Sequence, residues 1–144
     1  FLNWGQYNKP IIFSSDFIRA YETSMIVANE INLPIKAIQQ SELLRDRYFG
    51  DYDGKSVDNY FHIWREDPNS PDYAENSAES VLAVLERTTK LIFNLEKKHD
   101  RREIILVSHG DPLSILETVF RRVEPAKFRS LAKLENAEIR LLVS

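Results

Sequence analysis

The residue best placed to do chemistry in this sequence is His109, in the stretch ILVSHGDPLS at residues 105–114. An apolar run leads into His109 and Gly110, and Asp111 and Pro112 open the next segment. The pattern predicts a buried parallel strand with a histidine at its carboxyl end, where open α/β sheets bind ligands. Gly110 would let a ligand approach the backbone, and Pro112 suits the first turn of a following helix. Taken alone, however, a histidine in such a place is more often structural than functional.

A second polar turn carries an arginine. Residues 11–31 begin with a short β-rich run and continue with apolar residues at helical spacing. Between them, Ser14, Ser15 and Asp16 are N-cap candidates. Arg19 therefore falls in the first turn of a helix, where a cation is unfavourable unless an anion binds there too. This element alone favours an anion site and a solvated surface arginine equally.

The third candidate is the loop LLRDRYFGDYDGKS at residues 43–56, which has neither a helical nor a strand period and is typical of an ordered functional loop. Asp46 lies between Arg45 and Arg47, whose charges favour the ionised carboxylate unless the site is dry. When protonated, a carboxyl group beside cations near a phosphate pocket is suited to donate its proton to a leaving group. The alternative is a charged surface loop with a turn at Gly50.

Taken in the order in which they follow one another along the chain, these segments resemble the histidine phosphatase superfamily, the phosphoglycerate mutase-like phosphatases. SSDFIRAYET resembles the family motif whose arginine grips phosphate, here Arg19. LLRDRYFGDYDG resembles the family's acidic loop, in which the usual glutamate is Asp46 here. ENSAESVLAVLER, with Glu79 and Ser80, resembles the stretch ahead of a long helix, VSHGDPL resembles the motif of the second histidine, His109, and ENAEIRLL resembles the closing strand. The resemblance covers nearly the whole chain.

The resemblance implies a phosphomonoester hydrolase that works through a phosphohistidine intermediate. It implies that Arg19 binds the phosphate oxygens, that His109 donates a hydrogen bond to the same group, and that Asp46 protonates the leaving alcohol and then activates water. We expect further substrate contacts from Ser15, Arg45, Arg47 and Gly110. It implies no metal and no other cofactor, because arginine and histidine supply the positive charge.

The family's nucleophile is a histidine in an Arg-His-Gly motif on the first strand, and this sequence lacks that motif. The other histidines, His62 and His99, neither follow a predicted strand nor precede a glycine, so we interpret both as structural. The opening FLNWGQYNKP looks like the tail of the family's first helix. We therefore expect residues 1–144 to form a single histidine phosphatase-like domain that is incomplete at its N-terminus.

A sheet without that first strand would leave buried backbone groups unpaired, at a cost of roughly 1–3 kcal/mol each. Three expectations stay open. The missing residues exist but are unrecorded, the sequence is a fragment, or another segment fills the gap, for example by strand exchange with a second copy in a homodimer.

Composition fits a single domain of 144 residues and narrows the expected partners. The net charge is −3 with both signs interspersed, so we expect no nucleic acid, whereas clustered arginines suit a small phosphorylated substrate. The absence of cysteine excludes disulfides, thiolate metal sites and cysteine nucleophiles. No apolar run is long enough to span a membrane, so we expect no membrane partner. No leader is visible, although the missing start leaves a leader open, and we expect a cytoplasmic protein.

The alternation of strand and helix patterns predicts the α/β class, a three-layer sandwich with a mostly parallel sheet flanked by helices, as in phosphoglycerate mutase-like proteins. The expected strands are Pro10–Phe13, Ile35–Ile38, Ile104–Val107 and Ala137–Val143. The expected helices are Asp16–Ile31, Val57–Glu66, Glu79–Lys98, Leu113–Val123 and Pro125–Leu131. The longest helix carries an apolar stripe that we interpret as core.

Two choices of function remain at this point. The resemblance favours hydrolysis over phosphate shuttling. Mutases of the family carry an added insert with further arginines that hold the acid group of a sugar acid, whereas the segment between Gly54 and Glu79 has only one arginine, Arg65. Phe49 also stands where mutases commonly have tyrosine. The alternative to an enzyme is a non-catalytic phosphate-binding or protein-interaction module that has lost the nucleophile segment. A generic flavodoxin-like binding domain ranks last, because it explains neither Arg19 nor the acidic loop.

Overall fold

The computed structural model describes residues 9–100 and 102–143, and the chain divides into two compact units. The first, here called the sheet unit, comprises Phe1–Arg45 and Lys90–His109. The second, the helical unit, comprises Asp46–Thr89 and Gly110–Ser144. None of the described helices is long and apolar enough to cross a membrane.

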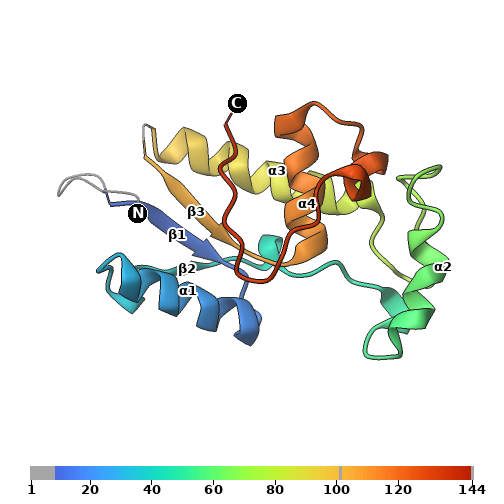
Figure 1. Ribbon diagram of the computed structural model, residues 1–144, viewed down its shortest axis with the longest axis horizontal. Coiled ribbons are helices and arrows are strands. Elements are labelled where there is room, and N and C mark those ends of the chain that lie inside the picture. The colour runs from blue at the N-terminus through green and yellow to red at the C-terminus, as the bar shows by residue number, and fades with distance from the viewer. Residues whose placement is uncertain (1–8, 101, 144) are drawn as a thin grey trace. The chain divides into compact units, whose positions relative to one another are not determined.

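The sheet unit is built on β1 (Ile11–Ser14), which lies between β2 (Gln39–Gln40) and β3 (Ile104–Val107) (Figure 1). Both neighbours pair with β1 in parallel, and the register sets Ser14 opposite Val107. The predicted strand at Ile104–Val107 is confirmed, and the one at Pro10–Phe13 is shifted by a single residue. Because β1 and β3 are parallel, the polar turns that follow them lie at the same end of the sheet, where both strands have their carboxyl ends.

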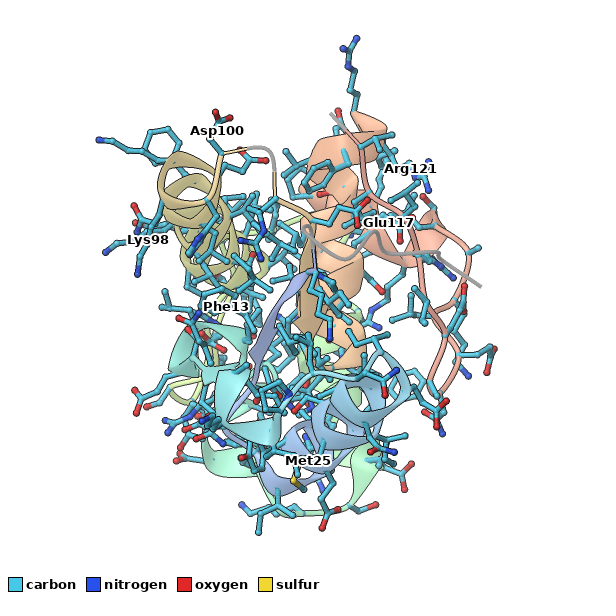
Figure 2. All side chains as sticks on the ribbon, turned by 90° about the vertical axis from the view of Figure 1, so that its left-hand side faces the viewer. Phe13, Met25, Lys98, Asp100, Glu117 and Arg121 are labelled. Carbon is cyan, nitrogen blue, oxygen red and sulfur yellow. The ribbon has the colours of Figure 1, made fainter. Side chains whose placement is uncertain are left out.

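One face of this sheet packs against α3 (Val81–Lys98). Phe13, which Figure 2 labels on β1, forms a buried cluster with Leu91 and Leu95 of that helix and with Leu44. The partly buried apolar residues of β1 and β3 extend the same cluster. The apolar stripe predicted for the longest helix is therefore confirmed as core.

The other face packs against α1 (Ile18–Glu30), which contacts both β1 and β3. Side chains alternate along a strand, so Ile12 points away from Phe13 and is fully buried. Ala20, Ser24 and Ala28 form the buried stripe of α1, one turn apart. Helices on both faces of a parallel sheet confirm the predicted α/β class.

In the helical unit, the first half of α3 packs on α4 (Gly110–Arg121). Val81 and Val84 form a buried cluster with Ile115 of α4 and Phe128. On α4, Glu117 and Arg121 lie one turn apart and form an ion pair of 3.2 Å (Figure 2). A second cluster joins Phe49, Ala78 and Ile63, the last from α2 (Phe61–Trp64).

The expected strand at Ile35–Ile38 is wrong. Residues Ile35–Ala37 form a 3₁₀ turn, closed by the amide of Ala37 donating to Pro34 O at 2.8 Å. The strand begins four residues later than expected, as β2, and consists of two exposed glutamines. Pairing with β1, rather than side-chain hydrophobicity, therefore decides where this edge strand forms.

The expected closing strand at Ala137–Val143 is also not formed among the described residues. Ile139, Leu141 and Val143 alternate as in a strand, but they are exposed. No described segment supplies ladder hydrogen bonds to this stretch, and an isolated extended segment is not a strand. The Arg140 side chain instead donates to the carbonyls of Ala132 and Lys133.

Other expected helices form with changed ends or a tighter winding. Residues Val57–Tyr60 and Pro125–Ser130 are 3₁₀ turns, and only Phe61–Trp64 of the expected Val57–Glu66 is α-helical. The N-cap of α1 is Phe17, not one of the three polar candidates before it. The helix α4 begins at Gly110, so Pro112 lies in its first turn as expected.

Gly50 permits a tight antiparallel contact in the helical unit. Phe49 bridges Ala78, and the amide of Asp51 donates to Asn76 O at 3.0 Å. Gly50 has φ +59°, and a Cβ there would lie 1.8 Å from Asn76 O. The backbone can approach this closely only because the residue has no side chain.

We expect Gly50→Ala to lower the free energy of unfolding by about 2–4 kcal/mol, because left-handed strain adds to a clash with fixed backbone. The control is Gly54→Ala, which has φ +76° but nothing within 4 Å of its Cβ, and which should cost about 1 kcal/mol. Urea unfolding of both variants measures the difference. Equal losses would contradict the close contact.

Candidate functional site

The carboxyl ends of β1 and β3 bring Ser15 and His109 together. His109 Nε2 lies 2.9 Å from Ser15 Oγ, and both side chains are buried. The amide of Ser15 donates to Val107 O at 2.8 Å, which continues the strand pairing to the point where the two side chains meet. The sheet therefore holds the imidazole in a defined orientation.

Phe17 connects His109 to the arginine that the sequence singled out. Its ring lies 5.4 Å from the His109 ring in an edge-on arrangement, and the Arg19 guanidinium carbon lies 5.2 Å from the Phe17 centroid. Arg19 is the second residue of α1, so it lies in the first turn of the helix as expected, and it is exposed. A cation in the first turn of a helix and a histidine at the adjacent strand end form an arrangement suited to an anion.

Arg45, an expected substrate contact, forms an ion pair with Asp16. Arg45 Nε donates to Asp16 Oδ1 at 2.8 Å, and Nη2 donates to Oδ2 at 2.5 Å and to Glu42 at 3.1 Å. Hydrogen bonding from Arg45 is the largest cause that holds the pKa of Asp16 below its ordinary value. Asp16, interpreted from the sequence only as a cap candidate, thus positions Arg45.

Asp46 lies in the helical unit and is partly buried. One of its carboxylate oxygens accepts a hydrogen bond of 3.0 Å from the amide of Arg47, and its carbonyl accepts one of 3.2 Å from Arg87 Nη2. The expected acid therefore stands on a backbone segment with defined partners.

Arg47, another expected substrate contact, is fully buried. Its guanidinium donates to both oxygens of Asp67, at 2.7 and 2.8 Å, and its Nε donates to Glu79 O at 2.9 Å. The side chains of Arg47 and Asp67 are 0% and 1% exposed. The geometry therefore supports a structural role for Arg47 in holding the acidic loop.

Two further charges surround that buried pair. Asp111 lies 3.8 Å from Arg47 and 3.1 Å from Arg129, and Arg129 lies 3.6 Å from Asp67. Burial raises the pKa of Asp111, and the two arginines oppose this shift. Arg129 also covers the face of the Trp64 ring at 4.9 Å.

Asp67 is the residue that sequence reasoning missed most clearly, because an aspartate in a proline-containing linker carries no signal of burial. Gly110, expected to allow close approach of a ligand, is exposed, and apart from its chain neighbours and the backbone of its own helix no described atom lies within 4 Å of where a Cβ would be. In residues 9–100 and 102–143, no group of three or more histidine or acidic side chains is arranged to hold a metal ion.

The other two histidines lie away from strand ends. His62 is exposed and stacks on Tyr52 at 6.0 Å. His99 lies 6.2 Å from the Phe13 ring, and its Nε2 is buried without a hydrogen-bond partner among the described residues. Neither is placed as the histidine of an Arg-His-Gly turn would be.

Comparison with known proteins gives consistent matches. The model of the histidine phosphatase superfamily (branch 1) matches residues 5–144. A phosphoglycerate mutase of Schizosaccharomyces pombe is 28% identical over 120 residues, which is 76% of this chain and 56% of that protein. Phosphoserine phosphatase 1 of Hydrogenobacter thermophilus is 26% identical over 124 residues, 83% of this chain and 58% of that protein.

Among solved structures, the mycobacterial glucosyl-3-phosphoglycerate phosphatase superimposes with a TM-score of 0.73 at 25% identity, over 89% of this chain and 66% of that chain. Another structure of that enzyme contains inorganic phosphate. The chain thus spans a little over half the length of the two curated relatives it matches.

We expect Asp67→Asn to lower the free energy of unfolding by about 3–5 kcal/mol, because it leaves the Arg47 guanidinium buried without its carboxylate. The control is Asp72→Asn, an exposed residue of the same linker, which should change stability by no more than about 0.5 kcal/mol. Urea unfolding of both variants is the measurement. A loss below about 1 kcal/mol for Asp67→Asn would contradict the buried pair.

The lowered pKa of Asp16 makes stability depend on pH. Its contribution is complete above the ordinary value of 3.8 and is lost as pH falls through the lowered pKa. Asp16→Asn should therefore be less stable than the wild type at pH 7, and the difference should disappear in strong acid. Urea unfolding at several pH values measures it, with the exposed Glu22→Gln on α1 as control. A pH-independent difference would rule out the ion pair as its source.

Proposed function

Because this chain belongs to the histidine phosphatase superfamily, we propose that the protein hydrolyses phosphomonoesters through a phosphohistidine intermediate. Phosphatases and a mutase are among its relatives, and all of these names denote enzymes of phosphate esters. The substrate would be a small phosphorylated molecule. A homodimer and a cytoplasmic location remain predictions from the sequence, as does the single domain.

The observation that carries the proposal is the meeting of His109 and Ser15 at the edge where β1 and β3 end, with Arg19 in the first turn of the helix that follows β1. Phe17 contacts the histidine ring and the arginine head. Arg19 offers a charged fork to phosphate oxygens, and His109 offers a ring nitrogen. Both groups would stabilise the charge that develops during phosphoryl transfer.

The chemistry has two steps. A histidine nitrogen attacks phosphorus, the bond from phosphorus to the ester oxygen breaks, and the carboxyl proton of Asp46 passes to the departing alcohol. In the second step water attacks the phosphohistidine, Asp46 takes the proton from that water, and the P–N bond breaks to release phosphate. The attacking histidine is not among these 144 residues in an Arg-His-Gly motif, so the proposal requires a nucleophile from outside them.

Hydrolysis, rather than transfer between hydroxyls of a sugar acid, is the finer part of the proposal. Phe49 is buried and stacks on Tyr60 at 4.2 Å, so this position offers no hydroxyl to a substrate. Arg65 pairs with Glu66 at 3.1 Å. In hydrolysis the phosphoryl group passes to water, and water needs no additional arginines to hold it.

The first test combines the intact mass of the purified full protein with turnover of a generic aryl phosphate. A mass above that of these 144 residues, together with turnover, supports the phosphatase. The mass of this chain alone with no turnover, but with binding of inorganic phosphate, supports the alternative of a non-catalytic phosphate-binding module. A result with neither turnover of the aryl phosphate nor binding of inorganic phosphate would reject the phosphate site.

We expect Arg19→Ala to lower kcat/KM for the aryl phosphate by about 10²–10³-fold, since it removes a preorganised charge from the phosphate. His109→Ala should lower kcat far more than it raises KM. The control is Lys36→Ala, an exposed cation of the same unit, which should leave kcat/KM unchanged. Normal turnover by Arg19→Ala would contradict the proposed binding of phosphate by Arg19.

A further inference from the structure

Glu79 and Arg87 form a two-point ion pair beside the acidic loop. Arg87 Nε donates to Glu79 Oε1 at 2.8 Å, and Arg87 Nη2 donates to Oε2 at 3.0 Å. Arg87 is on α3 and Glu79 precedes the first residue of that helix by two. The side chains are 15% and 25% exposed, so the pair is shielded from much of the solvent.

Both members of the pair also bind the loop backbone on either side of Arg47. Arg87 Nη2 donates to the carbonyl of Asp46 at 3.2 Å. Glu79 Oε2 accepts from the amide of Tyr48 at 2.9 Å, and the amide of Glu79 donates to Tyr48 O at 2.8 Å. Successive backbone groups from Asp46 to Tyr48 are therefore fixed by one ion pair.

Arg47, which lies between these backbone groups, also binds both Glu79 and Asp46. Its Nε donates to the carbonyl of Glu79, and its amide donates to the Asp46 carboxylate at 3.0 Å. The Asp46 carboxylate is thus oriented by the Arg47 amide. Arg87 holds the carbonyl of the same peptide group, and Glu79 holds the amide of the next one. Moving the Glu79–Arg87 pair would rotate that amide and carry the carboxylate with it.

We propose that Glu79 and Arg87 are positioning residues that set the orientation of the Asp46 carboxylate for proton transfer to the leaving group. The inference rests on the proposed phosphatase function, in which Asp46 is the acid. Neither residue touches the reacting atoms. A general acid contributes only when its proton lies within hydrogen-bond reach of the leaving oxygen, so the pair acts through Asp46.

The leaving group separates this role from a merely structural one. A nitrophenolate departs with little need of a proton, whereas an alkoxide needs one. In the full protein, Glu79→Gln and Arg87→Met should each lower kcat for a simple alkyl phosphate about tenfold more than kcat for p-nitrophenyl phosphate. General loss of fold would lower both rates equally and would overturn the proposal.

Matched controls come from the same helix. Glu86→Gln makes the same chemical change, and Lys90→Met likewise removes a cation, at exposed positions of α3, and both rates should stay at the wild-type level. In an Asp46→Asn background, Glu79→Gln should add no further selective loss, because it acts through the missing carboxyl. A selective loss that persists in this background would overturn the proposal.

A second measurement needs no turnover. Hydrogen exchange at the amide of Arg47, which donates to Asp46 but not to Glu79, should be about tenfold faster in Glu79→Gln and unchanged in Glu86→Gln. If the wild-type protein hydrolyses neither ester, the phosphatase proposal fails while this result still decides the positioning. Unchanged exchange in Glu79→Gln would overturn the positioning whether or not the protein turns over.

Discussion

The sheet unit depends on the parallel pairing of β1 with β3. That pairing aligns the two strand ends, so that the serine after one and the histidine after the other lie within hydrogen-bond distance. A shift of the register by one residue would turn Phe13 from its cluster with α3 and separate Ser15 from His109. The packing of the core and the geometry of the candidate site are therefore fixed by the same few backbone hydrogen bonds.

The sequence predicted the parts of the molecule that short-range patterns specify. The apolar run before His109, the helical spacing after Ser15 and the stripe on α3 all follow from a period of apolar residues, and all form as expected. The family itself could be inferred from motif order, and the match over residues 5–144 confirms it. The roles assigned to individual residues by that resemblance remain proposals.

What the sequence could not supply is the identity of each polar side chain's partner. Arg45 and Arg47 are both expected substrate contacts, and in the structure one pairs with Asp16 and the other with Asp67. These partners are 29 and 20 positions away, beyond the reach of any local period. The two missed strand predictions have the same origin, because a strand forms only where another backbone lies beside it.

The buried pair of Arg47 and Asp67 has an evolutionary consequence. Losing either member alone leaves an unpaired charge in the interior. Replacing both by apolar groups of similar volume can leave the free energy of unfolding nearly unchanged. Single substitutions at these positions should be purged, and viable lineages should pass through compensated double changes. Across relatives the two positions are therefore expected to co-vary, and their identities should be correlated more tightly than those of the exposed residues around them.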